Sequence, residues 1–331
     1  MTPEEILLLT PRQVRSLLTI DECIAAVEQT FRLCGEGKAV PPAVVGMHAP
    51  HGGFHVKIGL LDLGRHYFAA KVNGNFPENG DRFGLPTIQG VIVLCDAEKG
   101  FPLAVMDSRE ITSLRTGAAT AVAAKHLARR DSQTVIICGC GTQGRVQVKA
   151  LARIFRLQTV FAYDRSEERA LRFAREVTRD LKITARAVTD LAAAVRQSDI
   201  CVTCTTSRQA FLCSDDVAPG TFIAAVGADN PEKQELHPNL MAKSKIVADL
   251  VQQCAVMGDL HHALEAGAVT KADVYAELGE VVAGKKPGRE SDDEIIIFDS
   301  TGMALQDVAA TAFVYEKAER QGYGVRFSFA A

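Results

Sequence analysis

The feature that most constrains the fold is a run of apolar residues that ends in closely spaced glycines. Residues 134–138 read Thr-Val-Ile-Ile-Cys, and Gly139, Gly141 and Gly144 follow in the pattern G-x-G-x-x-G. Helical spacing of apolar residues over 143–155 then predicts that the glycines form a turn between a buried parallel strand and a helix. In such a turn the first glycine allows the bend, the second lets the backbone approach a pyrophosphate, and the third lets the helix pack closely on the strand. The unpaired amides of the helix N-terminus attract the phosphates.

A second strand supports a dinucleotide-binding site. Residues 159–164 read Thr-Val-Phe-Ala-Tyr-Asp, so this strand ends in Asp164, whose carboxylate would accept hydrogen bonds from the adenosine ribose. Arg165 comes next, and its guanidinium could instead accept the extra phosphate of NADP. NAD is the expected cofactor because the acid is present, and NADP is the alternative. Glycine turns in an ordinary α/β domain are the other interpretation of the motif.

The rest of the chain divides into two patterns. Between residues 41 and 106, apolar runs bounded by turn residues predict successive strands, with a hairpin at 96–100. After a long Ala-rich helix ending near 127, apolar runs alternate with helical segments, which is typical of a parallel sheet. We therefore expect an α/β protein with a Rossmann doubly wound domain over 128–305. A β-rich domain would cover 1–127 and 306–331, because the last helix could return to it.

The individual elements are expected at the following positions. Strands are expected at 6–9, 44–47, 53–58, 67–72, 90–96 and 101–106 before the glycine motif, and at 199–205, 222–226, 246–249 and 294–299 after it. Helices are expected at 110–127 and at about 303–321.

Composition argues against several classes of function. The net charge is -3, and Lys and Arg are scattered, so the chain has no basic field for nucleic acid. No run approaches the ~18 apolar residues of a membrane helix, and the first five residues are acidic where a signal peptide would be basic. The nine cysteines lie mostly in apolar runs, as reduced thiols would. We expect a cytoplasmic protein with no nucleic-acid or membrane partner.

A metal site is not expected from the cysteines. Cys201 and Cys204 have zinc-ligand spacing, but residues three apart on a strand point to opposite faces, and no matching pair follows. Three histidines are expected to be surface or core residues more often than ligands: His55, His261 and His262.

Five further segments, taken with the glycine motif, resemble the ornithine cyclodeaminase/mu-crystallin family. They are residues 71–79 (Lys-Val-Asn-Gly-Asn-Phe-Pro-Glu-Asn), 84–87 (Gly-Leu-Pro-Thr), 113–118 (Ser-Leu-Arg-Thr-Gly-Ala), 226–236 and 298–302 (Phe-Asp-Ser-Thr-Gly). The resemblance runs from about Pro41 to the last helix, and this combination is far more specific than the glycine fingerprint.

The resemblance implies both an architecture and an activity. A β-rich substrate and dimerisation domain, completed by the C-terminal helix, would accompany the Rossmann domain, and the protein would be a homodimer. Members use NAD(P) to interconvert an α-amino acid and its imine, as cyclodeaminases, amino-acid dehydrogenases or ketimine reductases.

The resemblance also implies roles for particular residues. Lys71 and Arg115 would hold the substrate carboxylate, and Asp229 would be the proton donor or acceptor. The residues implied at the cofactor are Thr87, Arg115, Gly139, Gly141, Thr142, Gln143, Gly144, Asp164, Arg165, Thr205, Val226, Lys233 and Ser300.

The chemistry of the residues supports these roles independently. Oxidation of an amino acid removes a hydride from Cα and a proton from nitrogen, so the site needs cations for the carboxylate and a base near the amine. Arg115 could fork onto a carboxylate, and a surface helix charge is its alternative. Lys71, on an otherwise apolar strand, needs a partner if it is buried. Asp229 follows a strand's carboxyl end, and a helix cap is its alternative.

One departure from the family pattern limits the prediction of the substrate. Cyclodeaminases that bind ornithine usually carry an arginine just after the proline that opens the β-rich region, and here Ala43 follows the two prolines. Lys57 could project into the same pocket and replace that arginine. A solvated strand lysine is an equally good interpretation of Lys57.

The leading hypothesis is an NAD-dependent enzyme that oxidises a small L-amino acid to its imine, or reduces an imine in reverse. A cyclodeaminase is the first alternative, in which a side-chain amine closes the ring, ammonia leaves and the same hydride returns. A ligand-binding protein similar to mu-crystallin is the second alternative. Lys71, Arg115 and Asp229 together argue against it, because storage needs no base beside a carboxylate clamp.

Overall fold

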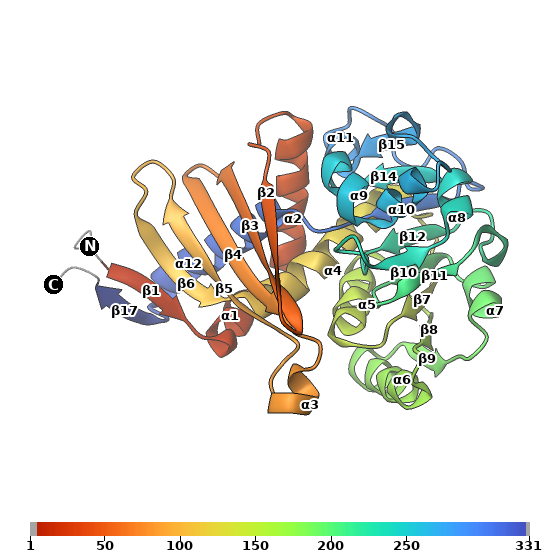
Figure 1. Ribbon diagram of the computed structural model, residues 1–331, viewed down its shortest axis with the longest axis horizontal. Coiled ribbons are helices and arrows are strands. Elements are labelled where there is room, and N and C mark those ends of the chain that lie inside the picture. The colour runs from red at the N-terminus through yellow and green to blue at the C-terminus, as the bar shows by residue number, and fades with distance from the viewer. Residues whose placement is uncertain (1–4, 329–331) are drawn as a thin grey trace. The chain divides into compact units, whose positions relative to one another are not determined.

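The structure is a computed structural model that describes residues 5–328, and the chain divides into two compact units (Figure 1). The first unit comprises the chain up to Arg115 together with the part from Met303 onward, and the second is Thr116–Gly302. The division falls inside α4 (Ser108–Leu127), so one helix belongs to both units.

The first unit is built on a mixed seven-stranded sheet. Strands β1 and β6 are parallel, and all other neighbours are antiparallel. The strands in spatial order are β17 (Val325–Ser328), β1 (Glu5–Leu9), β6 (Pro102–Asp107), β5 (Ile88–Asp96), β4 (His66–Asn75), β3 (Gly52–Asp62) and β2 (Ala43–Ala49).

Helix α12 (Ala304–Gln321) covers one face of this sheet, although it comes from the other end of the chain (Figure 1). It packs against β3, β4 and α2 (Ile20–Gly35). Burial alternates along β4 from Tyr67 to Lys71, as period-two side-chain placement requires when one face is covered. The unit also contains the short helices α1 (Pro11–Leu17) and α3 (Asn79–Phe83).

The second unit is built on an eight-stranded sheet in which every neighbouring pair is parallel. The strands in spatial order are β15 (Val274–Glu277), β14 (Lys245–Ala248), β16 (Ile296–Asp299), β12 (Phe222–Ala225), β10 (Ile200–Thr203), β7 (Thr134–Cys138), β8 (Thr159–Tyr163) and β9 (Thr184–Ala187). From β9 to β16 this is the order 3-2-1-4-5-6 of a doubly wound Rossmann fold, with two strands added at one edge. The order reverses between β7 and β10, where ligands of such sheets bind.

The remaining elements of the second unit cover and connect this sheet. The helices are α5 (Thr142–Ile154), α6 (Glu167–Leu181), α7 (Leu191–Arg196), α8 (Pro238–Ala242), α9 (Val251–Met257), α10 (Asp259–Glu265) and α11 (Leu278–Val282), with single 3-10 turns at Ser214–Asp216 and Lys271–Asp273. A small parallel pair joins β11 (Arg208–Leu212) to β13 (Gln234–Leu236).

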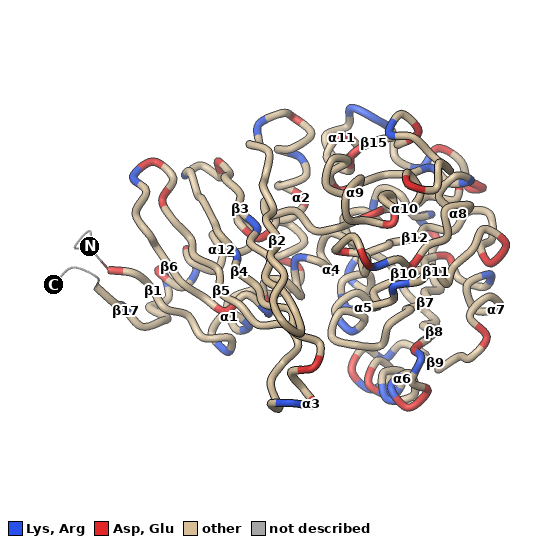
Figure 2. The backbone as a smooth tube through the Cα atoms, in the orientation of Figure 1, with Lys and Arg blue, Asp and Glu red and all other residues tan. Residues whose placement is uncertain are grey.

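The fold class expected from the sequence is confirmed, and each expected strand and helix is present within a few residues. Short strands with polar ends or few apolar residues, such as β9, β11, β13 and β17, were not predicted. Basic and acidic residues are interspersed along both units (Figure 2). Within residues 5–328, no helix is long and apolar enough to cross a membrane.

Candidate active site

The glycine turn after β7 has the geometry that its three glycines suggest. Gly139 has φ +107, and a Cβ there would lie 2.8 Å from the carbonyl oxygen of Cys204. A Cβ on Gly144 would lie 2.3 Å from the carbonyl oxygen of Gly139, so α5 packs directly on the turn. A Cβ on Gly141 would meet no atom within 4 Å, so the backbone at the start of α5 is open to a ligand.

The residues around this turn fit a dinucleotide. Thr142 and Gln143 are the first two residues of α5, so their amides point toward the open side of the turn. The side-chain Oε1 of Gln143 is buried and has no partner among the described residues. Pyrophosphate binds at a helix N-terminus where backbone amides are free and no side chain blocks their approach.

Asp164 stands at the carboxyl end of β8 and connects that strand to the glycine turn. Its carboxylate accepts hydrogen bonds from the amide of Cys140 at 3.0 Å and from the amide of Ser166 at 2.9 Å. Arg169, not Arg165, forms an ion pair with it, at 3.2 Å. Arg165 itself is exposed. The acid expected to bind the ribose is therefore held in place.

Glu235, which was not predicted as a site residue, joins the loops that follow β10 and β12 by hydrogen bonds. Its carboxylate is fully buried and accepts from the amide and the hydroxyl of Thr205, both at 2.6 Å, and from the amide of Gly227 at 3.0 Å. Burial raises the pKa of Glu235, although its hydrogen bonds to Thr205 lower it. Thr205, one of the predicted cofactor residues, is thus positioned by a buried acid.

A second buried acid organises the loop after β16. Asp249 accepts from the hydroxyl of Ser300 at 3.0 Å and from the amide of Gly302 at 2.7 Å. Asp299 precedes this loop, and burial raises its pKa to about 7.

Asp259 accepts from the amides of Glu235 and Leu236, both at 2.8 Å. Burial, together with the charge of Asp299, raises the pKa of Asp259 well above its ordinary value.

Asp229 lies in the loop after β12, between that strand and β13. Its carboxylate is half-exposed and forms an ion pair with Lys233 at 2.6 Å. Lys233 was expected to line the cofactor, and its side chain is mostly buried. Val226, at the start of the same loop, is half-buried. Thr87 belongs to the first unit, where it is exposed and its carbonyl accepts from the amide of Phe76.

Lys71 and Arg115 come together in the first unit, where they share one carboxylate. Lys71 Nζ lies 2.6 Å from Oδ2 of Asp307, and Arg115 Nε lies 3.2 Å from its Oδ1. All three side chains are buried. Arg115 also donates to Gln306 at 3.3 Å, and Lys71 contacts the hydroxyl of Thr112 at 3.5 Å. Two cations that share one carboxylate leave a positive charge for a second anion.

The electrostatics of this group follow from its burial. Burial lowers the pKa of Lys71 to about 7, against the opposing effect of Asp307, and the charges of Arg115 and Lys57 add to the decrease. Burial alone would raise the pKa of Asp307, but Lys71 and Arg115 hold it below the ordinary value. Loss of water from around the ammonium therefore outweighs its single ion pair.

Lys57 lies beside this group. It is the register partner of Lys71 across β3 and β4, so the two side chains leave the sheet on the same face. Its charge lowers the pKa values of both Lys71 and Asp307. That Lys57 binds substrate stays a prediction. Ala43, at the start of β2, brings no charge to the sheet.

Comparison with known proteins identifies the family. A model of the ornithine cyclodeaminase/mu-crystallin family matches residues 4–322. The chain belongs to this family. The resemblance inferred from the motifs is therefore confirmed.

Several members of the family are similar over almost their whole length. An alanine dehydrogenase of Archaeoglobus fulgidus is 43% identical over 98% of this chain and 99% of that protein. A solved archaeal alanine dehydrogenase dimer with bound NAD superposes with a TM-score of 0.94, at 43% identity, over 98% of this chain and 99% of that one. A pyrroline-2-carboxylate reductase of Thermococcus litoralis, in complex with NADH and L-proline, has a TM-score of 0.89 at 32% identity, over 97% and 99% of the two chains.

Three acids of the candidate site were missed from the sequence: Asp307, Glu235 and Asp249. Asp307 had a usable signal, because it is the one acid in the mostly apolar first turns of the last helix and buried cations need a partner. Glu235 and Asp249 had none, because they accept hydrogen bonds from the backbone amides of Thr205 and Gly302, which are 30 and 53 residues away in the sequence.

Proposed function

We propose that this chain is an NAD-dependent oxidoreductase that interconverts a small L-amino acid and its imine, and that L-alanine is its substrate. The observation that carries the proposal is the pair of buried cations, Lys71 and Arg115, that share the single carboxylate of Asp307. The choice of alanine rests on the alanine dehydrogenase that is 43% identical over nearly the whole chain.

The cation pair is suited to a substrate carboxylate. Arg115 presents a planar guanidinium that can donate two parallel hydrogen bonds, and Asp307 occupies its Nε. Lys71 adds a compact charge whose orientation is set by Asp307. Because water is largely absent around these groups, their attraction for an anion is stronger than at the surface.

Asp229 is proposed to move the nitrogen proton. During oxidation the amino acid loses a hydride from Cα and a proton from nitrogen, and a C=N double bond forms. When bound, NAD supplies the hydride acceptor. The carboxylate of Asp229 forms an ion pair with Lys233, and this carboxylate can accept the proton. In the reverse direction the protonated acid returns it to the imine nitrogen.

The preference for NAD over NADP is proposed from the end of β8. Asp164 Oδ1 accepts from the amide of Ser166 and pairs with Arg169, whereas Oδ2 accepts only from the amide of Cys140 among these groups, so Oδ2 has a lone pair for a ribose hydroxyl. A 2′-phosphate would be repelled by this acid. Comparison of kcat/KM for NADH and NADPH tests this preference, and equal values would contradict it.

A substrate panel tests the activity. L-Alanine, L-proline, L-ornithine and pyruvate with ammonia would be assayed with both cofactors, following NADH at 340 nm and ammonia in parallel. Net NADH formation with L-alanine is expected. Proline and ammonia from ornithine without net NADH would indicate a cyclodeaminase, and tight binding without turnover across the panel would indicate a carrier protein.

The variant Asp229→Asn tests the proton transfer. Removal of a general base lowers the rate by roughly 10²- to 10⁴-fold, so kcat should fall by at least that lower limit. Glu232→Gln is the matched control, because Glu232 is an exposed acid of the same loop that pairs with Arg208. Unchanged turnover in Asp229→Asn would remove Asp229 from the mechanism.

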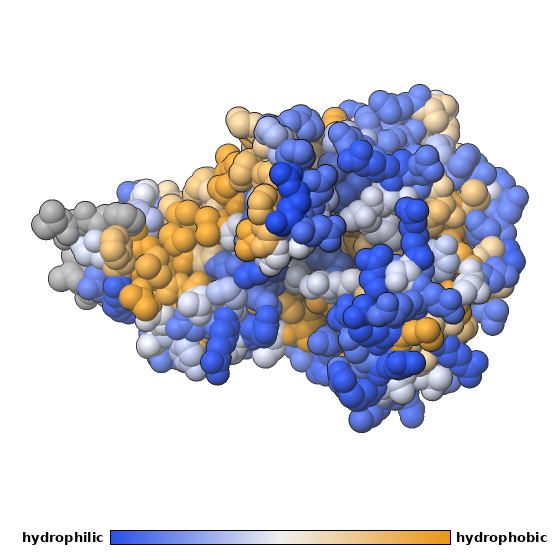
Figure 3. All heavy atoms as spheres, turned by 60° about the horizontal axis from the view of Figure 1, so that its bottom comes forward, coloured by the Kyte–Doolittle hydropathy of each residue, from blue (hydrophilic) through white to orange (hydrophobic). Residues whose placement is uncertain are grey.

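A row of valines on the sheet of the first unit supports a homodimer. Register places Val45, Val56, Val72 and Val91 side by side across β2, β3, β4 and β5. Three of them are exposed, at 59%, 37% and 45% for Val45, Val72 and Val91. Apolar side chains gather over this unit in Figure 3. We infer that a second copy of the chain covers this face, because an exposed apolar patch of this kind is typical of an interface.

Light scattering after size-exclusion chromatography tests the dimer. The wild type should have the mass of two chains, and Val45→Asp with Val91→Asp should have the mass of one. A monomeric wild type would contradict the inference.

A further inference from the structure

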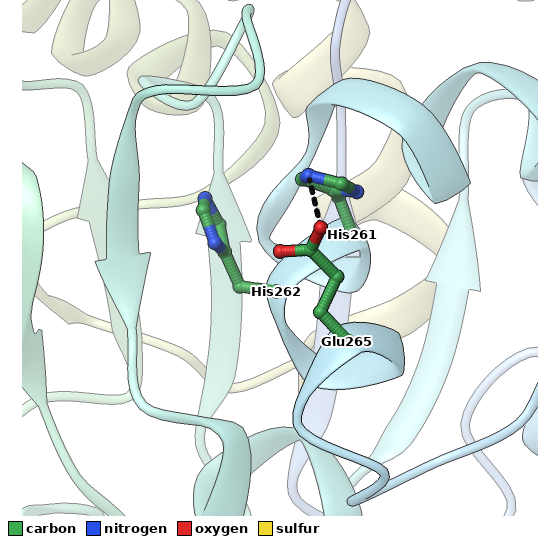
Figure 4. Close-up of side chains that lie close together, drawn as sticks. All are labelled: His261, His262 and Glu265. Atoms are coloured by element: carbon green, nitrogen blue, oxygen red, sulfur yellow. Dashed lines mark ion pairs between the residues drawn. The ribbon is translucent and has the colours of Figure 1, made fainter.

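Helix α10 brings together three side chains that are common metal ligands: His261, His262 and Glu265 (Figure 4). One ligand atom from each lies within 4.8 Å of the others. Among residues 5–328, this is the one such group of His, Cys, Asp and Glu. The helix belongs entirely to the second unit and follows directly on α9.

The two imidazole rings are oriented as metal ligands are. Nδ1 of His261 lies 3.3 Å from the carbonyl oxygen of Ala255, and Nε2 of His262 lies 2.9 Å from the carbonyl oxygen of Lys233. A carbonyl only accepts, so both of these nitrogens carry the hydrogen when the rings are neutral. The lone pairs are then on Nε2 of His261 and Nδ1 of His262. A backbone carbonyl behind the ring is the usual second partner of a metal-binding histidine.

The spacing also fits a tetrahedral ion. Nε2 of His261 lies 3.5 Å from Oε1 of Glu265. Two ligands that are each about 2.0–2.1 Å from a tetrahedral ion are about 3.3 Å apart. The three ligand atoms lie within 4.8 Å of one another, so separations wider than about 3.3 Å must shorten around an ion, and Glu265 can move because its side chain is 65% exposed and lies at the end of α10. In Figure 4 its carboxylate lies between the two rings.

We propose that His261, His262 and Glu265 form a site for a divalent transition-metal ion, with Zn²⁺ as the best fit. Two imidazoles and one carboxylate are the nitrogen and oxygen ligands that Zn²⁺ prefers, and water would complete the tetrahedron. The site is separate from the proposed chemistry but adjoins the loop that carries it. The ring of His262 is fixed on the carbonyl of Lys233, whose ammonium pairs with Asp229.

Metal titration of the full chain, with any affinity tag removed, tests this site. Zn²⁺ would be added in competition with a chromogenic chelator, and Co²⁺ would be added to record its visible spectrum. We expect one ion per chain and a Co²⁺ spectrum of a four-coordinate site. We also expect His261→Gln and Glu265→Gln each to weaken binding by at least about tenfold. His262→Gln should do the same, and its amide can still donate to the carbonyl of Lys233.

His66→Gln is the matched control. His66 lies on the first unit, with Glu98 at 3.3 Å and Asp62 at 3.7 Å, so it is another histidine beside carboxylates at the surface. Its replacement should leave the affinity unchanged. Absence of stoichiometric binding would overturn the proposal, and so would an affinity that is unchanged in both His261→Gln and Glu265→Gln. All of these measurements are independent of turnover, so failure of the metal site and failure of the proposed activity can be distinguished.

Discussion

Asp307 is expected to keep Lys71 protonated, so that Lys71 and Arg115 together form a cationic clamp for the substrate carboxylate. The variant Asp307→Asn tests this role. The wild-type carboxylate accepts from Lys71 and Arg115 inside the first unit. Asparagine has the same shape and can still accept one hydrogen bond, but it carries no charge. Because Asp307 is the one influence that raises the pKa of Lys71, this pKa should fall below its wild-type value of about 7. Lys71 would then be mostly neutral in neutral buffer.

The magnitude follows from the interactions that are lost. A hydrogen bond to a charged group contributes about 1.5–3 kcal/mol. Since each 1.4 kcal/mol is about a factor of ten, a carboxylate ligand should bind roughly 10- to 150-fold more weakly. Removal of one partner from a buried ion pair also costs about 3–5 kcal/mol of stability.

The best probe is a carboxylate without an amine, because the substrate amine titrates too. Propionate would be measured as a competitive inhibitor of amino-acid oxidation between pH 6 and 9. Lys71 binds an anion well only when protonated, so Ki should rise as pH increases through about 7 in the wild type. In Asp307→Asn, Ki should be higher and should begin to rise at lower pH.

A matched control lies on the same helix. Glu316 accepts from the hydroxyl of Tyr67, and its side chain is half-exposed, so Glu316→Gln should leave Ki unchanged. A lower Ki in Asp307→Asn would show that the acid competes with the ligand, and would refute its positioning role. A wild-type Ki that does not depend on pH near 7 would refute the assignment of Lys71.

Four further variants test other residues of the candidate site. Gly144→Ala should destabilise the protein by about 1–3 kcal/mol in thermal unfolding, because its Cβ would lie 2.3 Å from a backbone oxygen. Gly141→Ala has room for its Cβ, so it should keep wild-type stability but raise KM for NAD, and equal stability losses in both variants would contradict this. In Glu235→Gln, the side-chain NH2 group would face the amide of Thr205 or of Gly227, and two donors cannot form a hydrogen bond. KM for NAD should therefore rise without a change in the propionate Ki. Lys57→Met should raise KM for the amino acid several-fold in steady-state kinetics, and an unchanged KM would remove Lys57 from the clamp.

The geometry of the glycine turn was predictable because its signals are local. Gly139 has positive φ, and Gly144 contacts the backbone of the same turn. Each position requires a glycine, and both glycines lie within six residues of the sequence. Asp164 could be placed at a strand end because consecutive strands of a βαβ unit end on the same edge. Lys71 and Arg115 were predicted as substrate ligands from the resemblance, and burial of a lysine in an apolar strand already required a partner.

The identity of that partner could not be predicted. Lys71 and Asp307 are 236 residues apart, and they meet because α12 returns to cover β3 and β4. Arg169, five residues after Asp164 and in the first turn of α6, pairs with that acid, and this contact was not predicted either.

The sequence by itself determined the strand–turn–helix of the glycine motif, the alternation that makes a parallel sheet, and the residue types of the site. These depend on backbone conformation and on periodicity, which act over a few residues. Only the tertiary structure decided which acid neutralises which cation, which loops Glu235 joins, and that the ring of His262 lies on the carbonyl of Lys233. Burial and ion pairing depend on chain segments that are brought together by packing, and no local rule specifies their partners.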